Sequence, residues 1–241
     1  MRAILTLHAI EAEGDVLTLR PEAFESLLDG LAAAGHRVVP LTELLARPGV
    51  PDQVAVTFDD GLASVAEEAL PILARRGLVA TVFVVTDHVG SDNDWPGQPA
   101  SIVRRPTMGW GELEALAEAG WGIGSHTRTH PDLRGASAQQ LADEIGGAAD
   151  AIRTRLGRDP VGFAWPGGAV DAAARTCARR HHRWALGTRL ARLDAAVDDP
   201  FDLPRVDTWY LRHRQLHPLL GTAAADAWIG ARARIRAWRA R

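Results

Sequence analysis

The sequence contains no lysine and a single cysteine, Cys177, in 241 residues. One cysteine cannot form an internal disulfide, so disulfide stabilisation is excluded and Cys177 is expected to be a buried structural thiol. All 27 basic residues are therefore arginines, scattered except along an expected final helix at residues 223–239. That helix is interpreted as having a solvated arginine face, with contact to a membrane surface or a partner as the alternative. The net charge of -3 predicts no nucleic-acid partner.

Long hydrophobic runs are also absent. Residues 1–8 have too short an apolar run for a signal peptide, and no later segment approaches the length of a membrane span. The expected location is therefore the cytoplasm, and the oligomeric state is left open. With 46% hydrophobic residues, a chain of this length can bury one large core. We expect one domain over residues 1–241, closed by the helix at 223–239.

Apolar β-type runs alternate with helical patterns along the chain. Buried strands are predicted at residues 4–7, 54–58, 79–85, 121–125, 161–165, 184–188 and 203–207. This alternation favours an α/β barrel or a doubly wound sheet, and the residues alone leave both open.

Two adjacent carboxylates, Asp59 and Asp60, follow the strand predicted at 54–58. A strand directs neighbouring side chains to opposite sides, so the two can share a target only if the strand breaks here, which Gly61 permits. A helix cap for the segment beginning near Leu62 is an equally good interpretation of this stretch alone. Partners elsewhere in the sequence must decide between the two.

Two histidines, His126 and His130, stand four residues apart at the end of another predicted strand. This spacing places two imidazoles on one side of a helical turn, where they can bind one metal ion. Two imidazoles and one carboxylate leave coordination positions open for water and substrate. If Asp60 is that carboxylate, Asp59 stays unligated and can take a proton from metal-bound water.

His8 and Trp95 are further candidates. His8 ends the first predicted strand, where parallel α/β proteins place reacting groups, although a structural histidine is equally consistent with this position. Trp95 lies in a long loop, residues 87–107, rich in glycine, proline and acidic residues. It is either a platform for stacking a sugar or a tryptophan packed on its own domain.

Three segments, residues 57–61 (TFDDG), 125–133 (SHTRTHPDL) and 163–168 (FAWPGG), resemble the first three motifs of the polysaccharide deacetylase family. This family is also called the NodB-homology family or carbohydrate esterase family four. The resemblance implies a distorted (β/α) barrel of about seven strands and metal-dependent removal of N- or O-acetyl groups from sugars. It also implies that Asp59 is the base and that Asp60, His126 and His130 hold a divalent ion, most often Zn²⁺.

The sequence departs from the family pattern in two places. Ala164 and Trp165, followed by Pro166, stand where many members carry an arginine that steers the base, and the usual C-terminal Leu-x-x-His acid motif is missing. The form FAWPGG is similar to the branch of poly-N-acetylglucosamine deacetylases, whose acid histidine follows the first strand. By this resemblance His8 is the candidate acid, and His217 is the alternative.

Arg205 is the candidate substitute for the missing arginine near Asp59, with a structural ion pair as the competing interpretation. Together with Trp95 and Pro166, it completes the residues expected to orient base or substrate. The predicted substrate is an acetylated sugar, an oligosaccharide or a lipid-linked glycan. The alternatives are a metal-dependent deformylase or amidase acting on a lipid-linked sugar or a small amide, and a non-catalytic carbohydrate-binding barrel.

Overall fold

The computed structural model describes residues 1–194 and 196–239, and its centre is a closed barrel of parallel strands. Strand β1 pairs along its whole length with β5 on one side, and on the other its residues Leu5 and Thr6 pair with β10. This second pairing closes the barrel and excludes the doubly wound sheet. The barrel strands are β1 (Arg2–Leu7), β5 (Gln53–Phe58), β6 (Thr81–Val84), β7 (Gly122–Ser125), β8 (Phe163–Ala164), β9 (Ala185–Leu190) and β10 (Leu203–Asp207). The predicted single-domain, seven-stranded barrel is confirmed.

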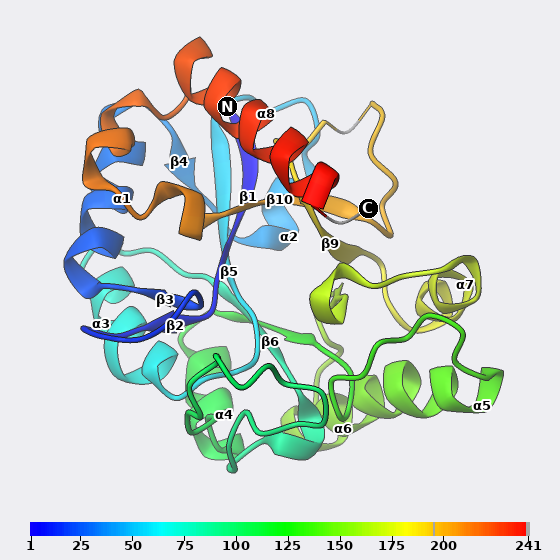
Figure 1. Ribbon diagram of the computed structural model, residues 1–241. Coiled ribbons are helices and arrows are strands. Elements are labelled where there is room, and N and C mark those ends of the chain that lie inside the picture. The colour runs from blue at the N-terminus through cyan, green and yellow to red at the C-terminus, as the bar shows by residue number, and fades with distance from the viewer. Residues whose placement is uncertain (195, 240–241) are drawn as a thin grey trace.

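Three short strands lie outside this ring. β4 (Arg37–Val38) pairs with the first half of β5, whereas β2 (Ala9–Ile10) and β3 (Thr18–Leu19) form a separate parallel pair. Helices surround the barrel, with α1 and α3 on one side of β1 and β5 and with α5, α6 and α7 on the other (Figure 1). The helices are α1 (Pro21–Ala33), α2 (Leu41–Ala46), α3 (Leu70–Ala74), α4 (Trp110–Glu118), α5 (Ala138–Leu141), α6 (Gly147–Leu156), α7 (Ala172–His181) and α8 (Ala223–Arg239).

Short helical segments complete the chain. Two π-helical turns, η1 (Val65–Ala69) and η3 (Ala142–Gly146), precede α3 and α6. The 3₁₀ turns are η2 (Thr86–His88), η4 (Pro166–Gly168), η5 (Thr208–Leu211) and η6 (Arg214–Leu219). Ser137 and Gln140 form a reciprocal capping box, and α5, η3 and α6 follow one another to Leu156.

The barrel interior is filled by one alternating side-chain set. Of the ten buried residues in one hydrophobic cluster, six come from six different barrel strands: Ile4, Ala55, Phe83, Ala164, Leu186 and Leu203. Their strand neighbours face outward and pack under the surrounding helices in a second cluster that includes Leu5, Val56 and Val206. By the period of two, Thr6 and Arg205 also belong to the inner set, nearer the C-terminal end of the barrel.

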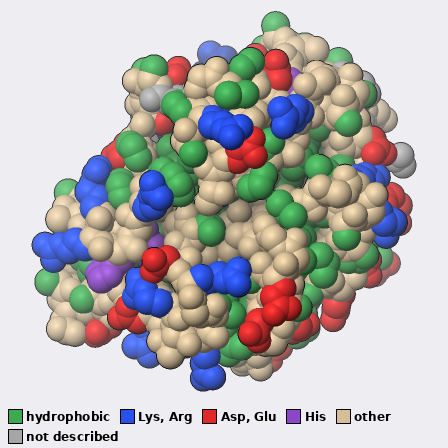
Figure 2. All heavy atoms as spheres, turned by 180° about the vertical axis from the view of Figure 1, so that it is seen from behind, with side chains coloured by type: hydrophobic (Ala, Val, Ile, Leu, Met, Phe, Trp, Pro, Cys, Tyr) green, Lys and Arg blue, Asp and Glu red, His purple; other side chains and the backbone are tan. Residues whose placement is uncertain are grey.

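The surface carries both signs of charge. On the face seen in Figure 2, arginine side chains lie interspersed with acidic ones. Arg241, the last of the C-terminal arginines, lies outside the described residues. Within residues 1–194 and 196–239, no helix combines the length and apolar character needed to cross a lipid bilayer.

A third hydrophobic cluster, under α5 and α7, packs against a buried histidine, His182. His182 is 7% exposed and its ring packs against Phe163, with ring centroids 5.2 Å apart. Burial, which disfavours the imidazolium, lowers the pKa of His182 to about 4. At neutral pH the ring is therefore uncharged in the folded protein.

This histidine predicts a loss of stability in mild acid. An unfolded histidine has a pKa of about 6.5, so the unfolded chain takes up the proton first as the pH falls. Above pH about 6.5 His182 is neutral in both the folded and the unfolded chain, so it has no effect on the pH dependence of stability there. Between pH about 6.5 and pH 4 the free energy of unfolding decreases, by up to about 3 kcal/mol. Urea unfolding at pH 7.5 and pH 5 should show a smaller pH-dependent loss for His182→Leu than for the unchanged protein. Equal losses would contradict this account.

Candidate active site

The barrel brings Asp59 directly to Arg205. Asp59 follows β5, and its N–H donates to the carbonyl oxygen of Leu7 at 2.9 Å, so the strand pairing continues to this residue. Arg205 of β10 donates from Nη1 and Nη2 to the two carboxylate oxygens of Asp59, both at 2.7 Å, and from Nε to the carbonyl oxygen of Gly187 at 2.9 Å. Both side chains are almost fully buried. The guanidinium therefore fixes the position of both Asp59 oxygens.

The charge of Asp59 follows from this pairing. Burial by itself raises the pKa of the carboxyl, but Arg205, His126 and His8 favour the ionised form and together hold the pKa well below its usual range. Asp59 is therefore ionised at neutral pH.

Asp60 reaches the same end of the barrel because the strand breaks at it. Its φ is 71°, in the left-handed region, and Gly61 follows with φ 68°. The strand thus breaks at Asp60, one residue before Gly61, where the break was predicted. Aspartate tolerates this left-handed conformation better than most residues do. The pleat no longer separates Asp59 from Asp60, and both line one cavity.

The two histidines of the second motif point at Asp60. His126 Nε2 is 3.5 Å and His130 Nε2 is 3.7 Å from Asp60 Oδ1. His126 Nδ1 is 2.8 Å from the carbonyl oxygen of Ala164, which accepts its hydrogen and leaves Nε2 free to bind a metal. Among the described residues, these three form the one group whose ligand atoms lie within 4.8 Å of one another.

The predicted helical turn between the histidines is wrong. Residues 126–130 form a loop in which Thr127 has φ 68° and His130 has φ 61°. The His130 N–H donates to Thr127 Oγ1 at 2.9 Å, and the Thr127 carbonyl accepts from the Thr86 N–H at 3.1 Å. One contact within the loop and one from Thr86 thus favour two left-handed residues over a regular turn, and non-glycine residues in this conformation cluster at functional sites.

Glu144 holds this loop, and the sequence analysis missed it. Its carboxylate accepts from the N–H groups of Arg128 and Thr129 at 2.9 and 3.0 Å, and from Thr129 Oγ1 at 2.7 Å. Glu144 lies in the π-helical turn η3, a kind of turn frequent at functional sites. No local pattern marks it, because it contacts the loop 15 and 16 residues away in the sequence.

Glu144→Gln is expected to weaken metal binding by about 10–100-fold, the usual effect of removing a partner that orients a ligand. In the variant an amide nitrogen replaces one carboxylate oxygen, and this nitrogen cannot accept the hydrogen bonds that the oxygen accepts from residues 128 and 129. Asp143→Asn is the matched control, because Asp143 is exposed and accepts from Gln139 on its own helix. Titration against a chromophoric chelator measures both; equal affinities for the two variants would contradict the role of Glu144.

The indole of Trp95 packs against His130, one of the candidate metal ligands, and offers no free face to a sugar. Its ring stacks on His130, with centroids 4.5 Å apart and planes at 28°, and the residue is 3% exposed. His88 contacts the same indole edge-on, at 5.4 Å between ring centroids. Of the two interpretations of Trp95, the geometry fits the tryptophan packed on its own domain, where it restrains His130.

His8 and His217, the two candidate acids, lie in different places. His8 follows β1 and lines a cavity of about 310 Å³ together with Asp59, Asp60, His126 and His130. His217 is buried, 2.9 Å from Ser26 Oγ through Nδ1 and 2.7 Å from the carbonyl oxygen of Leu211 through Nε2. Of these two histidines, His8 is the one that lines the cavity.

The cavity continues into a neighbouring hollow of about 350 Å³. Both are lined by Gln98, Pro99, His130 and Gly167. Pro166 and Trp95 line the second hollow. The loop at 87–107 and the turn η4 thus extend the cavity to one side of the histidine pair.

The two histidines differ in their affinity for a proton. Burial lowers the pKa of His126, but the contacts with Asp60 and Asp59 outweigh it and the pKa is raised. Burial and the neighbouring His126 lower the pKa of His130 to about 4. His130 is therefore a neutral imidazole at pH 7, the form that binds a metal.

The chemistry of this donor set fits a divalent ion. Asp60, His126 and His130 offer one carboxylate oxygen and two imidazole nitrogens, converging at the C-terminal end of the barrel strands. Three such protein ligands are typical of catalytic zinc sites, where further coordination positions remain open. The burial of Asp60 and His126, the partial burial of His130 and the oriented Nδ1 of His126 agree with a site built for an ion.

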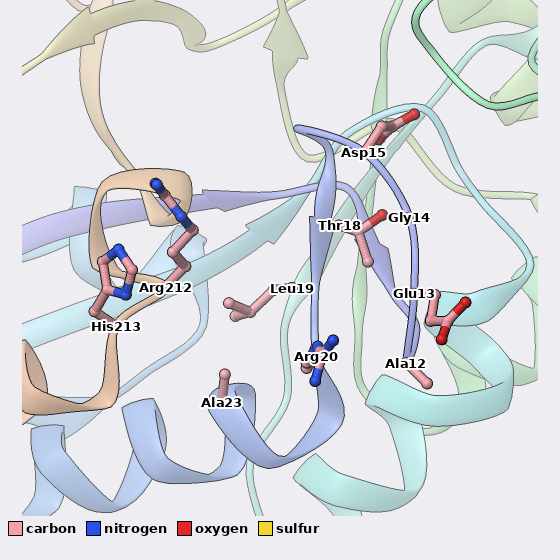
Figure 3. A pocket seen from close by; sticks show the side chains of 10 residues that line it. All are labelled: Ala12, Glu13, Gly14, Asp15, Thr18, Leu19, Arg20, Ala23, Arg212 and His213. Carbon is pink, nitrogen blue, oxygen red and sulfur yellow. The ribbon is translucent and has the colours of Figure 1, made fainter.

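A larger hollow of about 440 Å³ lies elsewhere (Figure 3). Its lining comes from residues 12–20 and from Ala23, Arg212 and His213. None of the predicted site residues lines it, so its size does not make it the active site.

The chain is thus a parallel (β/α) barrel with a carboxylate–histidine–histidine group, a candidate metal site, at the C-terminal ends of its strands. Residues 46–183 match the model of the polysaccharide deacetylase family, and the chain belongs to this family. The family predicted from the three motifs is thereby confirmed.

Curated relatives match the chain in part. A chitin deacetylase from Pestalotiopsis sp is 30% identical over 142 residues, which are 57% of this chain and 43% of the relative. The peptidoglycan-N-acetylglucosamine deacetylase PgdA of Listeria monocytogenes is 32% identical over 120 residues, 49% of this chain and 22% of the relative. The chain therefore matches less than half the length of each of these relatives.

Solved structures agree in fold. IcaB from Ammonifex degensii superposes with a TM-score of 0.74 at 22% identity, covering 90% of this chain and 98% of that one. The deacetylase PplD of Streptococcus pyogenes, solved in complex with acetate, gives 0.72 at 22% identity, covering 86% and 91%. At this identity the likeness concerns the barrel itself.

Proposed function

We propose that this protein is a metal-dependent hydrolase that removes N-acetyl groups, or O-acetyl groups, from a carbohydrate. One observation carries the proposal: Asp59, held by Arg205, lines the same cavity as the group Asp60, His126 and His130. A helix cap needs one carboxylate and no histidine, whereas hydrolysis of an amide needs both a base and a stabiliser of developing negative charge.

Asp60, His126 and His130 are the residues that would hold the ion, and Zn²⁺ suits this donor set. When bound, such an ion supplies Lewis-acid chemistry, which lowers the pKa of water and stabilises negative charge on a carbonyl oxygen. Asp59 is not a member of this group; its two oxygens accept hydrogen bonds from Arg205 and keep further lone pairs. It stays available for proton transfer.

The protein's own groups then divide the proton transfers. Asp59 accepts a proton from the attacking water, whose oxygen bonds to the acetyl carbon. His8 protonates the nitrogen as the carbon–nitrogen bond breaks, so that acetate and an amine leave. Both residues line the cavity, and their charges act on one another: His8 contributes to the lowered pKa of Asp59.

The names of the relatives point to the substrate class. One is a chitin deacetylase and another a peptidoglycan-N-acetylglucosamine deacetylase. By this likeness we assign to the present chain an acetylated sugar, oligosaccharide or lipid-linked glycan as substrate.

The test is release of acid from N-acetylated and N-formylated amino sugars, with and without a chelator. Acetate release that stops with chelator and returns with Zn²⁺ is the expected result. Formate release alone would identify a deformylase, and sugar binding without release of either acid would identify a non-catalytic binder; each would overturn the proposal.

A further inference from the structure

One wall of the cavity carries polar groups that proton transfer does not use. Thr6 of β1 lies in register with Asp207 of β10, and both line the cavity beside Asp59 and Arg205. Arg236, from the last turns of α8, lines the same wall. The three residues come from the first strand, the last strand and the C-terminal helix, so the fold itself brings them together.

The Thr6 hydroxyl is unsatisfied. The residue is 7% exposed, and Oγ1 has no hydrogen-bond partner within the part of the chain that the structure describes. Thr57, on the neighbouring strand, shows the usual arrangement, because its hydroxyl donates to the carbonyl oxygen of Leu5 at 2.7 Å. A buried hydroxyl that lines a cavity without a protein partner is suited to a ligand.

Asp207 and Arg236 form a loose pair. Arg236 Nη1 is 3.8 Å from Asp207 Oδ2, farther than a hydrogen bond, and the side chains are 38% and 34% exposed. The other Asp207 oxygen accepts from the Trp209 N–H at 2.9 Å. Donors of Arg236 and one oxygen of Asp207 thus remain able to bond a molecule in the cavity.

The charge of this wall selects between two kinds of ligand. A phosphate or carboxylate would gain from Arg236 but would meet the Asp207 carboxylate beside it, so the pair attracts an anion weakly. Neighbouring hydroxyl groups of a neutral sugar can instead donate to Asp207 and accept from Arg236 and Thr6. The array of donors and acceptors matches a sugar.

We infer that Thr6, Asp207 and Arg236 form a subsite for the hydroxyl groups of a neutral sugar unit beside the acetylated one. This inference rests on the proposed function, since it places a second part of that substrate. The subsite would bind and position the substrate without taking part in the chemical step, so its loss should raise KM and change kcat little.

Kinetics of Thr6→Val and Arg236→Gln on an N-acetylglucosamine tetramer test the subsite. We expect KM to rise about 3–10-fold for Thr6→Val and about 10–100-fold for Arg236→Gln, as for a neutral and a charged hydrogen bond. The N-acetylglucosamine monomer should be affected less. Arg232→Gln is the matched control on α8, because Arg232 stacks on Trp228 and does not line the cavity.

Stability separates a binding role from a structural one. Because the Thr6 hydroxyl has no protein partner, Thr6→Val should melt no lower than the unchanged protein, whereas Thr57→Val should melt lower. An unchanged KM in both Thr6→Val and Arg236→Gln would overturn the inference. So would a KM effect confined to substrates that carry a phosphate or carboxylate, since the wall would then recognise charge.

Direct binding distinguishes failure of the subsite from failure of the proposed function. Calorimetry with the deacetylated tetramer requires no turnover and should show weaker binding to Arg236→Gln than to the unchanged protein. If the unchanged protein releases no acetate yet this difference is found, the subsite stands and the proposed reaction falls. If acetate is released and the two proteins bind the tetramer equally, the reaction stands and the subsite falls.

Discussion

Asp59→Asn is expected to lower kcat by about 10²–10⁴-fold while leaving the metal content unchanged, the usual cost of losing a general base. An amide cannot accept the proton of the attacking water. Asp59 also lies outside the candidate ligand group Asp60, His126 and His130, and its two carboxylate oxygens bond Arg205. Turnover and metal content should therefore respond differently, which is the signature of a base that is not a ligand.

The control for this prediction concerns folding. Asp59→Asn leaves the buried Arg205 guanidinium without its counter-charge, and breaking a buried pair costs about 3–5 kcal/mol. Asp15→Asn is the matched variant, since it takes a carboxylate from Arg105, another buried guanidinium, in an ion pair outside the cavity. It should alter stability and keep kcat. A folded Asp59→Asn protein with full turnover would remove Asp59 from the mechanism.

His126→Ala is expected to lose bound metal, with affinity falling by more than about 100-fold. The His126 side chain supplies one of the three candidate ligand atoms. Removing even a residue that only hydrogen-bonds to a metal ligand lowers metal affinity by about 10–100-fold, so removing the ligand itself should lower it further. Activity should fall with metal occupancy and return in part at high Zn²⁺ concentration. Elemental analysis after gel filtration gives the metal content for each protein.

A second buried histidine provides the comparison for this experiment. His182 is also buried but lies under α5 and α7, away from the cavity, so His182→Leu should keep a full complement of metal. Retention of metal by His126→Ala would show that the ion, if bound, sits elsewhere. Loss of metal from both variants would trace the effect to the fold instead of the ligand.

The strand ends were predictable because the sequence pattern reports burial directly. Runs such as residues 54–58 are apolar on both faces, and parallel strands buried on both faces bring their C-terminal ends to one side of the barrel. This placed Asp59, Asp60, His126 and His8 near one another without knowledge of the pairing order. Closure of the barrel was not predictable from the runs, since it depends on β1 pairing with both β5 and β10.

Contacts between distant residues leave no local pattern in the sequence. Arg205 was a candidate partner of Asp59 only through the resemblance to the family, and the structure pairs the two residues across 146 positions. Glu144, which lies in the π-helical turn η3, was missed because it contacts the histidine loop 15 and 16 positions away. The helical turn predicted for residues 126–130 was wrong for the same reason, because Thr127 is held by Thr86, which belongs to another segment.

The paired aspartates show how the structure completes a sequence argument. Alternation along a strand argued against a common target, and Gly61 was the predicted point of escape. The left-handed φ of Asp60 places the break one residue earlier than Gly61, so that Asp59 keeps the inward direction of the strand and Asp60 turns to the histidines. The backbone thus directs Asp59 and Asp60 to different partners, as the proposed roles of base and metal ligand require.

The most direct test is acetate release from an N-acetylglucosamine oligomer by the protein stripped of metal and then reconstituted. The account predicts negligible release after chelation and dialysis, and recovery when one equivalent of Zn²⁺ is added, with no recovery in His126→Ala at the same Zn²⁺ concentration. Acetate release by the stripped protein at the rate of the reconstituted one would contradict it.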